Sequence, residues 1–339
     1  MDDVQNFVEI GSTKDAKSIQ VNTKALVDRF FDFDADRIKA TLKEFNLPSS
    51  GIKQDMRFIV EKALIHRNLT EEDLFERILE WEPWSHRHVY FIKLAKADRD
   101  KISQPTYIQE QLLLKKITEY VGREQAFFLP LQLKLDHIKI ESNTISITIL
   151  APHYTYERAP AEDQFDENSD RVARISYRKR SRKAFHFELN LKTGRGYISI
   201  PAVQKGGRYN KERDSIEKMV RGFLGLSEFE ISKIRPALEK LVKSDDVVSN
   251  SLAVSFAGDL QMSLKSTKKK KALFADKSTK ALEKFSQTGF YSEGAFYYPL
   301  EGKKSEFRFK LYDDERLGIF SDLDEKEFRD VIRLVLSNA

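Results

Sequence analysis

The spacing of hydrophobic residues changes along this chain from a helical period to a strand period. Up to about residue 96, apolar positions recur at helical intervals, as in Ile38, Leu42 and Phe45. Between residues 131 and 149, leucine and isoleucine alternate with polar residues, a pattern typical of antiparallel strands with one buried face. The sequence therefore predicts an α+β fold, in which an N-terminal all-helical bundle precedes a domain with an antiparallel β-meander sheet and packed helices.

This pattern divides the chain into three predicted segments. Residues 1–22 are polar with two short apolar patches, which predicts an arm or a hairpin. Residues 23–122 predict a helical module that ends in a long connecting helix at about 104–121, and residues 123–339 predict the α+β domain. Within that domain we expect a strand at 171–191 that returns through 197–200, helices at 212–224, 227–243 and 278–286, a strand at 252–256, a hairpin over 295–311 and a final helix at 323–336.

Length and composition exclude several classes of protein. A chain of 339 residues has room for about two domains. No run approaches the ~18 apolar residues of a membrane-spanning helix, and the polar start Met1–Gln5 differs from a secretory signal. The absence of cysteine excludes disulfide scaffolds, thiolate zinc sites and thiol catalysis. We therefore expect an intracellular protein of the cytoplasm or nucleoid, or of the nucleus in a eukaryote, with no membrane contact.

Charge is distributed in blocks, although the chain as a whole has 58 Lys and Arg against 53 Asp and Glu. Residues 171–213 contain thirteen basic and two acidic residues, and residues 265–284 contain eight lysines and two acids. Acidic residues gather instead at 157–170 and 313–330. Such a separation favours a polyanionic partner over solvated faces of an ordinary soluble protein. The partner we expect is DNA, with duplex favoured and RNA also compatible.

One segment has a spacing typical of a DNA-binding motif. In residues 34–64, Ile38 and Leu42 fit the buried side of a first helix, and Gly51 permits the turn into a second. Lys53 falls in the first turn of that second helix, where backbone N–H groups also face outward, so it can contact a phosphate. The spaced positions are Ile38, Lys39, Leu42, Leu47, Pro48, Gly51, Lys53 and Met56.

These positions resemble the SAP module, a short helix–linker–helix fold that binds DNA. The resemblance implies that Lys39 and Lys53 belong to a DNA-binding surface. Two positions depart from the family pattern: Asn46 stands where a glycine is usual, and Arg57 stands where an apolar residue normally follows Met56. The same segment also fits a generic helical pair of the death-fold or pyrin-like type, which binds proteins, and this alternative stays open.

The order of the predicted elements suggests a second, fainter resemblance. A helical bundle, a long helix, a β-meander with a basic strand and a mixed α/β part resemble the layout of the centromere protein N family of the inner kinetochore. The local similarity is at residues 145–156, which precede the basic strand. This resemblance implies that both parts of the chain hold nucleosomal DNA.

The predicted strand at 172–191 has a strongly basic face. Its odd positions are mostly apolar or aromatic, whereas the even positions Arg174, Arg178, Arg180 and Arg182 point the other way. At a rise of ~3.3 Å per residue, alternate side chains lie about 6.6 Å apart, so guanidinium groups can reach successive phosphates. We expect these arginines to be exposed, because a core would leave their charges unsolvated. The alternative is an edge strand that is charged only to prevent aggregation.

The predicted contact surface combines these arginines with other basic residues. The lysine run at 268–271 lies in an expected loop that can contact a nucleic-acid backbone or serve as a nuclear import signal. The candidate nucleic-acid-binding residues are Arg174, Arg178, Lys179, Arg180, Arg182, Lys183, Arg195, Lys205, Arg208, Lys39, Lys53, Lys268, Lys269, Lys270 and Lys271.

Catalytic patterns are weak. Residues 206–207 form a Gly-Gly pair without the Lys-Ser/Thr context of a phosphate loop, and His86 and His88 have no ligand partners nearby in the sequence. A metal-dependent nuclease needs clustered carboxylates beside a lysine, and Glu188 with Lys192 is a candidate pair. Their spacing of four residues differs from the usual two, so we expect no enzyme, no metal and no cofactor.

The sequence thus favours a non-enzymatic DNA-binding protein that contacts duplex phosphates through a basic sheet face and a SAP-like module. One alternative is a protein–protein adaptor, or an accessory subunit of a DNA-processing or anti-phage defence complex. In that case the acidic residues 313–330 would dock a basic partner. Other protein subunits are expected partners under either hypothesis. A metal-dependent nuclease is the third hypothesis.

Overall fold

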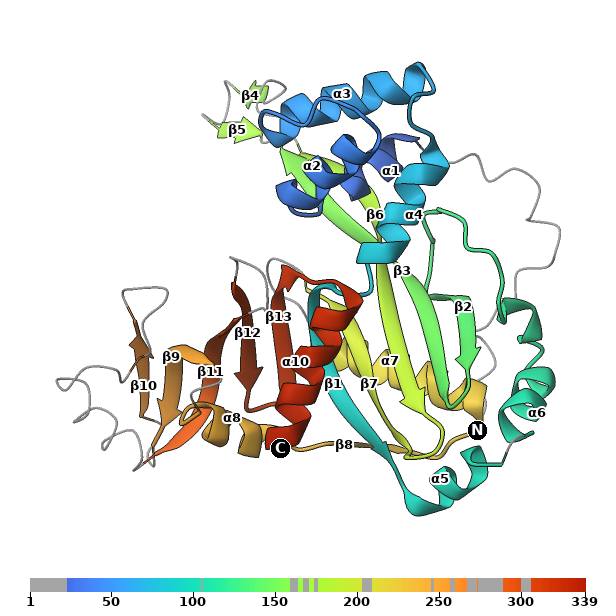
Figure 1. Ribbon diagram of the computed structural model, residues 1–339, viewed down its shortest axis with the longest axis vertical. Coiled ribbons are helices and arrows are strands. Elements are labelled where there is room, and N and C mark those ends of the chain that lie inside the picture. Colours follow the sequence, from blue (N-terminus) through green and yellow to red (C-terminus); the bar gives the residue numbers. More distant parts are fainter. Residues whose placement is uncertain are drawn as a thin grey trace. The chain divides into compact units, whose positions relative to one another are not determined.

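The computed structural model describes residues 23–104, 106–158, 164–166, 171–173, 176–202, 209–244, 247–256, 260–266, 273, 289–299 and 306–339. The fold is α+β, as the sequence predicts (Figure 1). The arm predicted at 1–22 and the helix predicted at 278–286 lie outside the described residues. Among the residues described, no helix is long and apolar enough to cross a membrane.

The chain forms two compact units whose boundaries do not follow the order of the sequence. We call Met1–Glu80, Glu124–Asp136 and Ile149–Ala184 the helical unit, and Trp81–Arg123, His137–Thr148 and Phe185–Ala339 the sheet unit. The structure therefore divides the chain differently from the predicted boundary at residue 122. Three strands contribute residues to both units, namely β2 (Lys134–Glu141), β3 (Thr144–Arg158) and β6 (Ser176–Asn190).

Short helices make up the N-terminal part of the helical unit: α1 (Thr23–Phe30), α2 (Ala35–Glu44), α3 (Lys53–Ile65) and α4 (Glu71–Trp81). Their apolar residues recur at helical spacing and are buried, including Phe30, Ile38 and Met56. The first turn of α4 has a capping box. The backbone N–H of Thr70 donates to Oδ2 of Asp73 at 2.8 Å, and the N–H of Asp73 donates to Oγ1 of Thr70 at 3.1 Å.

An extended segment joins α2 to α3, which is the arrangement expected for residues 34–64. Asn46 has φ +55° and Gly51 has φ +104°, both in the left-handed region that glycine adopts most easily. Asn46 stands where the SAP pattern has a glycine, and it adopts a glycine-like conformation. Ile38, Leu42 and Met56 are fully buried, as the spacing predicts. This agreement concerns the local backbone and its core residues.

An eleven-stranded antiparallel sheet, in the order β10-β9-β11-β12-β13-β1-β7-β6-β3-β2 with β8 beside β1, runs through the structure. The strands not yet defined are β1 (Ser85–Leu94), β7 (Arg195–Pro201), β8 (Phe229–Ile231), β9 (Val248–Ser255), β10 (Gln261–Lys265), β11 (Phe290–Pro299), β12 (Glu306–Tyr312) and β13 (Arg316–Asp322). A separate two-stranded sheet pairs β4 (Gln164–Asp166) with β5 (Arg171–Ala173). Central strand β1 pairs with β7 on one side and with β13 on the other.

Helices cover both faces of the sheet in the sheet unit. Odd-numbered residues such as Val89 of β1 and Phe309 of β12 join one core with α8 (Arg235–Leu241) and α10 (Glu325–Asn338), which lies across the strands in Figure 1. Even-numbered residues of β1 point to the opposite face, where α7 (Tyr209–Leu224) begins. The remaining elements of this unit are α5 (Lys96–Ile102), α6 (Tyr107–Leu114) and the 3₁₀ turn η3 (Thr118–Tyr120).

Several predicted elements are confirmed, and three are wrong. The strands at 197–200 and 252–256, the hairpin over 295–311 and the helices at 212–224 and 323–336 correspond to β7, β9, β11–β12, α7 and α10. The single strand predicted at 171–191 is confirmed only in part: β6 covers Ser176–Asn190, whereas Arg171–Ala173 form β5, which pairs with β4 in the separate sheet. The all-helical module does not extend to residue 96, because β1 follows α4. The long helix at 104–121 is also absent from the described residues, since α6 ends at Leu114 and Lys116 has φ +56°. The helix at 227–243 is instead β8 followed by α8, which has proline in its first turn.

Candidate functional site

The structure describes only part of the predicted basic surface. In the helical unit it describes Lys39, Lys53, Arg178, Lys179, Arg180, Arg182 and Lys183, and in the sheet unit Arg195. The other candidates, Arg174, Lys205, Arg208, Lys268, Lys269, Lys270 and Lys271, lie outside the described residues. The described residues fall into different environments, so they do not form one uniform basic surface.

The prediction that the arginines of β6 are exposed is correct for two residues and wrong for a third. Arg178 and Arg180 are exposed, as expected. Arg182 is only 4% exposed, and its guanidinium lies 5.4 Å from the ring centroid of Phe75 and 4.8 Å from that of Phe127. The buried cation lies between two aromatic rings, whose faces stabilise its charge in place of solvent.

The burial pattern of β6 explains this correction. The even positions Arg182 and Ala184 are buried, whereas from Phe185 onward the odd positions are buried. The change occurs where the strand passes from the helical unit to the sheet unit. One alternation with a period of two does not hold across the whole strand, because the strand has two cores, and each covers a different set of positions.

Exposed tyrosines accompany the two exposed arginines. Tyr154 and Tyr156 lie on β3, the neighbour of β6, and Tyr156 is 73% exposed. The guanidinium carbon of Arg178 lies 3.6 Å from the ring centroid of Tyr154, so these side chains share a face. Because alternate residues of a strand point the same way, Tyr156 and Arg180 belong to this face too. We call these four residues the tyrosine–arginine face.

Other cations of the helical unit have intramolecular partners. Asp28 lies between Lys179, whose Nζ is 2.7 Å away, and Arg57, whose Nη2 is 2.5 Å away. Burial by itself raises the pKa of the Asp28 carboxyl. Hydrogen bonds from Lys179 and Arg57, together with their charges, lower the pKa by more than burial raises it, so the net shift is downward. Arg57, which departs from the SAP pattern, thus joins α3 to α1, and Lys179 contributes to the same ionic cluster.

The two lysines of the SAP-like segment differ in their surroundings. The Lys53 ammonium donates to the carbonyl oxygens of Phe31 and Phe33 at 3.0 and 2.5 Å. It therefore satisfies backbone acceptors after α1, a structural role that the sequence spacing did not reveal. Lys39 lies 4.0 Å from the exposed carboxylate of Asp36, one turn earlier on α2. Lys39 can therefore still contact a ligand, whereas the ammonium of Lys53 is already bonded.

The two residues of the candidate nuclease pair, Glu188 and Lys192, lie in different environments. The Glu188 carboxylate binds Arg329 of α10 through both oxygens and also accepts a hydrogen bond from Tyr197 at 3.0 Å. Lys192 lies in the exposed turn between β6 and β7. Glu188 is therefore part of a structural network between the sheet and α10.

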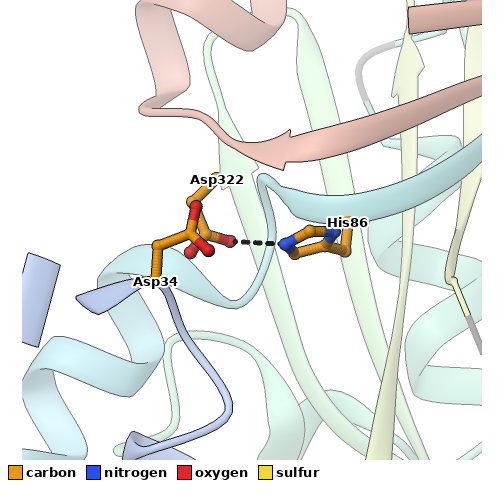
Figure 2. Close-up of side chains that lie close together, drawn as sticks. All are labelled: Asp34, His86 and Asp322. Carbon is orange, nitrogen blue, oxygen red and sulfur yellow. Dashed lines mark ion pairs between the residues drawn. The ribbon is translucent and has the colours of Figure 1, made fainter. Parts of the chain in front are cut away.

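The two histidines of β1 have different environments. Nε2 of His86 lies 3.4 Å from Oδ1 of Asp322, which is on the paired strand β13 (Figure 2). His86 has φ +47°, and the strand register shifts between Ser85 and Arg87, so a bulge turns its side chain toward Asp322. His88 is 3% exposed and is therefore a packing residue.

A cluster of aromatic and basic side chains surrounds His88 and was not predicted. Its ring lies 4.0 Å from that of Tyr209 on α7 and 5.8 Å from that of Phe320 on β13. Arg316 of β13 lies over the rings of Tyr209 and Tyr312, at 5.0 and 4.0 Å. We call His88, Tyr209, Lys310, Tyr312, Arg316 and Phe320 the His88 cluster.

The His88 cluster has a distinctive electrostatic environment. Burial lowers the pKa of His88 to about 3, with further contributions from Arg316, Arg87 and Lys310. Burial likewise raises the pKa of the Tyr312 phenol to about 12. Both groups are therefore neutral near pH 7. The alternation along a strand can indicate that two residues share a face, such as Lys310 and Tyr312 on one side of β12. It cannot indicate that these residues contact side chains of β1 and α7.

The acidic residues at 313–330 have mainly structural roles within the sheet unit. Glu315 accepts hydrogen bonds from the backbone N–H groups of Ile234 and Arg235 at the start of α8. Asp324 and Glu327 form the capping box of α10. The segment covers a turn, β13 and the first turns of α10, so it is a folded part of the sheet unit rather than an acidic tail.

The comparisons with known proteins give no family. No protein-family model matches the chain, and no curated protein matches it either.

Proposed function

We propose that this protein binds DNA through backbone phosphates, with the tyrosine–arginine face of the helical unit as its contact surface. The observation that supports this proposal is the exposure of Arg178 and Arg180 on the same face as Tyr154 and Tyr156. Arg180 forms no ion pair with any residue in the described ranges. Its charge is therefore available to a ligand.

The chemistry of these side chains suits nucleic acid. Arginine presents N–H donors in a planar fork that matches phosphate oxygens. Tyrosine beside it offers an aromatic surface to sugars or bases. Because phosphate contacts do not distinguish bases, we expect similar affinities for unrelated DNA sequences. Lys39, which is on α2 of the same unit, is a secondary candidate.

A reversal of charge tests this proposal. The variant with both Arg178→Glu and Arg180→Glu changes the charge by four without touching buried Arg182. Fluorescence anisotropy with a labelled duplex should show loss of most affinity. For the wild type, log K should fall with log salt by about 0.9 per phosphate contacted. Circular dichroism checks that the fold is retained.

A matched control separates local contact from general electrostatics. Lys115→Glu with Lys326→Glu makes the same change of charge at exposed positions of the sheet unit. This control should retain the affinity of the wild type. If it weakens binding as much as the arginine pair does, or if the arginine pair binds normally, the tyrosine–arginine face is not the DNA site.

A protein–protein adaptor is the second candidate, and one observation favours it. Phe58 and Ile65 of α3 are 67% and 79% exposed and lie seven residues apart, so they share one helix face. Exposed apolar side chains on one face are typical of partner-binding helices. Under this hypothesis, proteins captured by the full chain after nuclease treatment should be lost with Phe58→Ser and Ile65→Ser together. The same proteins should be retained with Arg178→Glu and Arg180→Glu.

A further inference from the structure

We propose that the His88 cluster is a binding site for a phosphate monoester, in which Arg316 binds the phosphoryl oxygens. This site is separate from the proposed DNA contact, because all of its residues belong to the sheet unit. The proposal depends on the placement of Arg316, on an unsatisfied nitrogen of His88 and on the arrangement of charges around them.

The Arg316 side chain is held in one orientation, and some of its N–H groups donate no hydrogen bond within the described ranges. Its guanidinium lies between the rings of Tyr209 and Tyr312, at 5.0 and 4.0 Å, and its side chain is 15% exposed. Its Nε donates to Oδ1 of Asp314 at 3.3 Å. Within the described ranges its two terminal amino groups have no acceptor. An arginine that is oriented by stacking and retains its terminal donors is suited to a bidentate contact with a phosphoryl group.

His88 supplies a second, independent observation. Its Nδ1 is buried and has no hydrogen-bond partner among the residues that the structure describes. A buried polar atom of this kind destabilises the protein when it is left unsatisfied. The His88 ring is in contact with Tyr209, which also stacks on Arg316, so a ligand at Arg316 is within the same cluster. A hydroxyl or phosphoryl oxygen of a ligand can satisfy this nitrogen, as donor or acceptor according to the tautomer.

The arrangement of charge favours an anion. Lys310 lies 4.6 Å from the Tyr312 ring and pairs with Glu293, and Arg213 of α7 pairs with Asp214. In these pairs and in Arg316–Asp314, the cation is less exposed than its acid. In each pair the acid is therefore the partner nearer to solvent. Lys310 and Arg316 lie over the ring of Tyr312 in the cluster, and Arg213 lies over the ring of Tyr90. Arg87 is next to His88 in β1, but its side chain points to the other face of the sheet and donates to Ser199, so it is not part of the cluster.

The aromatic residues suggest the source of the phosphate. The rings of Tyr209, Tyr312 and Phe320 surround His88 at centroid distances of 4.0, 6.1 and 5.8 Å. Aromatic side chains at this density provide stacking surface for a planar group attached to the phosphate. A nucleotide meets both requirements, and inorganic phosphate meets only the first. The two sources are distinguished by comparing their affinities.

The experiment is a calorimetric titration of the full chain with three probes: inorganic phosphate, adenosine 5′-monophosphate and adenosine. We expect the two phosphates to bind and adenosine not to bind. Tighter binding of the monophosphate identifies a nucleotide as the source, and equal binding identifies the phosphate alone. Both results support the site. If neither phosphate binds, the proposal is wrong.

Variants locate the binding event. Arg316→Gln should weaken binding of both phosphates by about tenfold or more, and Arg316→Lys should weaken it less, because the charge remains while the planar fork is lost. The matched control is Arg235→Gln, which removes another arginine that lies over an aromatic ring, 4.8 Å from the centroid of Phe290. The control should bind like the wild type. Equal losses in Arg316→Gln and Arg235→Gln would show only a general effect of charge and would overturn the proposal.

A spectroscopic readout remains informative if Arg316→Gln folds poorly. The wild-type protein can be titrated with phosphate while the histidine ring signals are followed by NMR, with His88 assigned from the signal missing in His88→Gln. The His88 signal should shift on saturation, and the signal of exposed His66 should not. A bound phosphate that leaves the His88 signal unmoved lies elsewhere, which would contradict the assignment.

Discussion

Arg329 of α10 holds Glu188 of β6 through a bidentate ion pair, with Nη1 2.9 Å from Oε1 and Nη2 3.0 Å from Oε2. The same carboxylate accepts a hydrogen bond from the buried Tyr197 phenol. The hydrogen bonds that Arg329 donates to Glu188 are the largest reason that the pKa of Arg329 is raised. The pair joins the C-terminal helix to β6 of the sheet. It also occupies the carboxylate on which the nuclease hypothesis depends.

Replacing Glu188 should therefore reduce stability. Glu188→Ala leaves the Tyr197 hydroxyl and the Arg329 guanidinium without their shared acceptor, which we expect to lower the free energy of unfolding by about 1–3 kcal/mol. Urea unfolding monitored by circular dichroism measures the change. Asp330→Ala, which breaks the exposed pair with Arg333, should cost about 0–1 kcal/mol. Similar values for the two variants would contradict a structural role for Glu188.

Acid should destabilise the sheet unit through His88. Its pKa is about 3 in the folded protein against 6.5 for the ordinary side chain, so between these values the unfolded chain binds a proton that the folded protein does not. The stability that depends on neutral His88 is therefore fully present above pH 6.5 and decreases as the pH falls toward 3. The slope contributed by this group is at most about 1.4 kcal/mol per pH unit.

The measurement compares the pH dependence of unfolding in two variants. His88→Gln removes the titrating group and should flatten the decrease of stability between pH 6.5 and 3, whatever its effect at neutral pH. His66→Gln, at an exposed position, controls for the loss of one histidine. An unchanged slope in His88→Gln would show that other groups cause the acid sensitivity.

Replacing Arg182 on β6 should reduce stability, whereas replacing the neighbouring Arg180 should not. Arg182→Ala removes a buried side chain between Phe75 and Phe127 and should lower the free energy of unfolding by about 2 kcal/mol or more. Arg182→Met, which keeps most of the apolar packing, should lose less. Arg180→Ala should leave stability within about 0.5 kcal/mol, because its side chain is exposed. Thermal unfolding of the three variants distinguishes these outcomes, and equal losses at both positions would refute the difference in burial.

Two glycines should respond in opposite directions to alanine. A Cβ at Gly196 of β7 would lie 2.0 Å from the carbonyl oxygen of Glu188, and a backbone atom cannot rotate away. We expect Gly196→Ala to cost about 2–3 kcal/mol. At Gly222 of α7 a Cβ meets no atom within 4 Å, so Gly222→Ala should stabilise by up to about 1 kcal/mol through helix propensity. Chemical denaturation of both variants tests the contrast, and a neutral Gly196→Ala would show that β6 and β7 can separate without loss.

Local elements were determined by the sequence because their causes are local. The alternation of apolar and polar residues is sufficient for the hairpins and strands that were predicted correctly. The capping box of Thr70 with Asp73 and the helical period at 323–336 need only residues within a few positions of one another. The α+β class follows from the order of these elements. β1 was missed because β strands buried in the middle of a sheet lack a clear alternation, and nine of its ten residues are at least partly buried.

The environment of each functional candidate was decided only by the tertiary structure. Arg180 and Arg182 are equivalent in the pattern of the strand, yet one is exposed and the other is covered by residues from α4 and from the segment before β2. Lys53 donates hydrogen bonds to carbonyl groups that are twenty or more positions away in the chain. The His88 cluster joins residues of β1, α7, β12 and β13. Burial and charge pairing arise from contacts between segments distant in the sequence, and a period of two or 3.6 residues contains no information about which distant segment covers a given face.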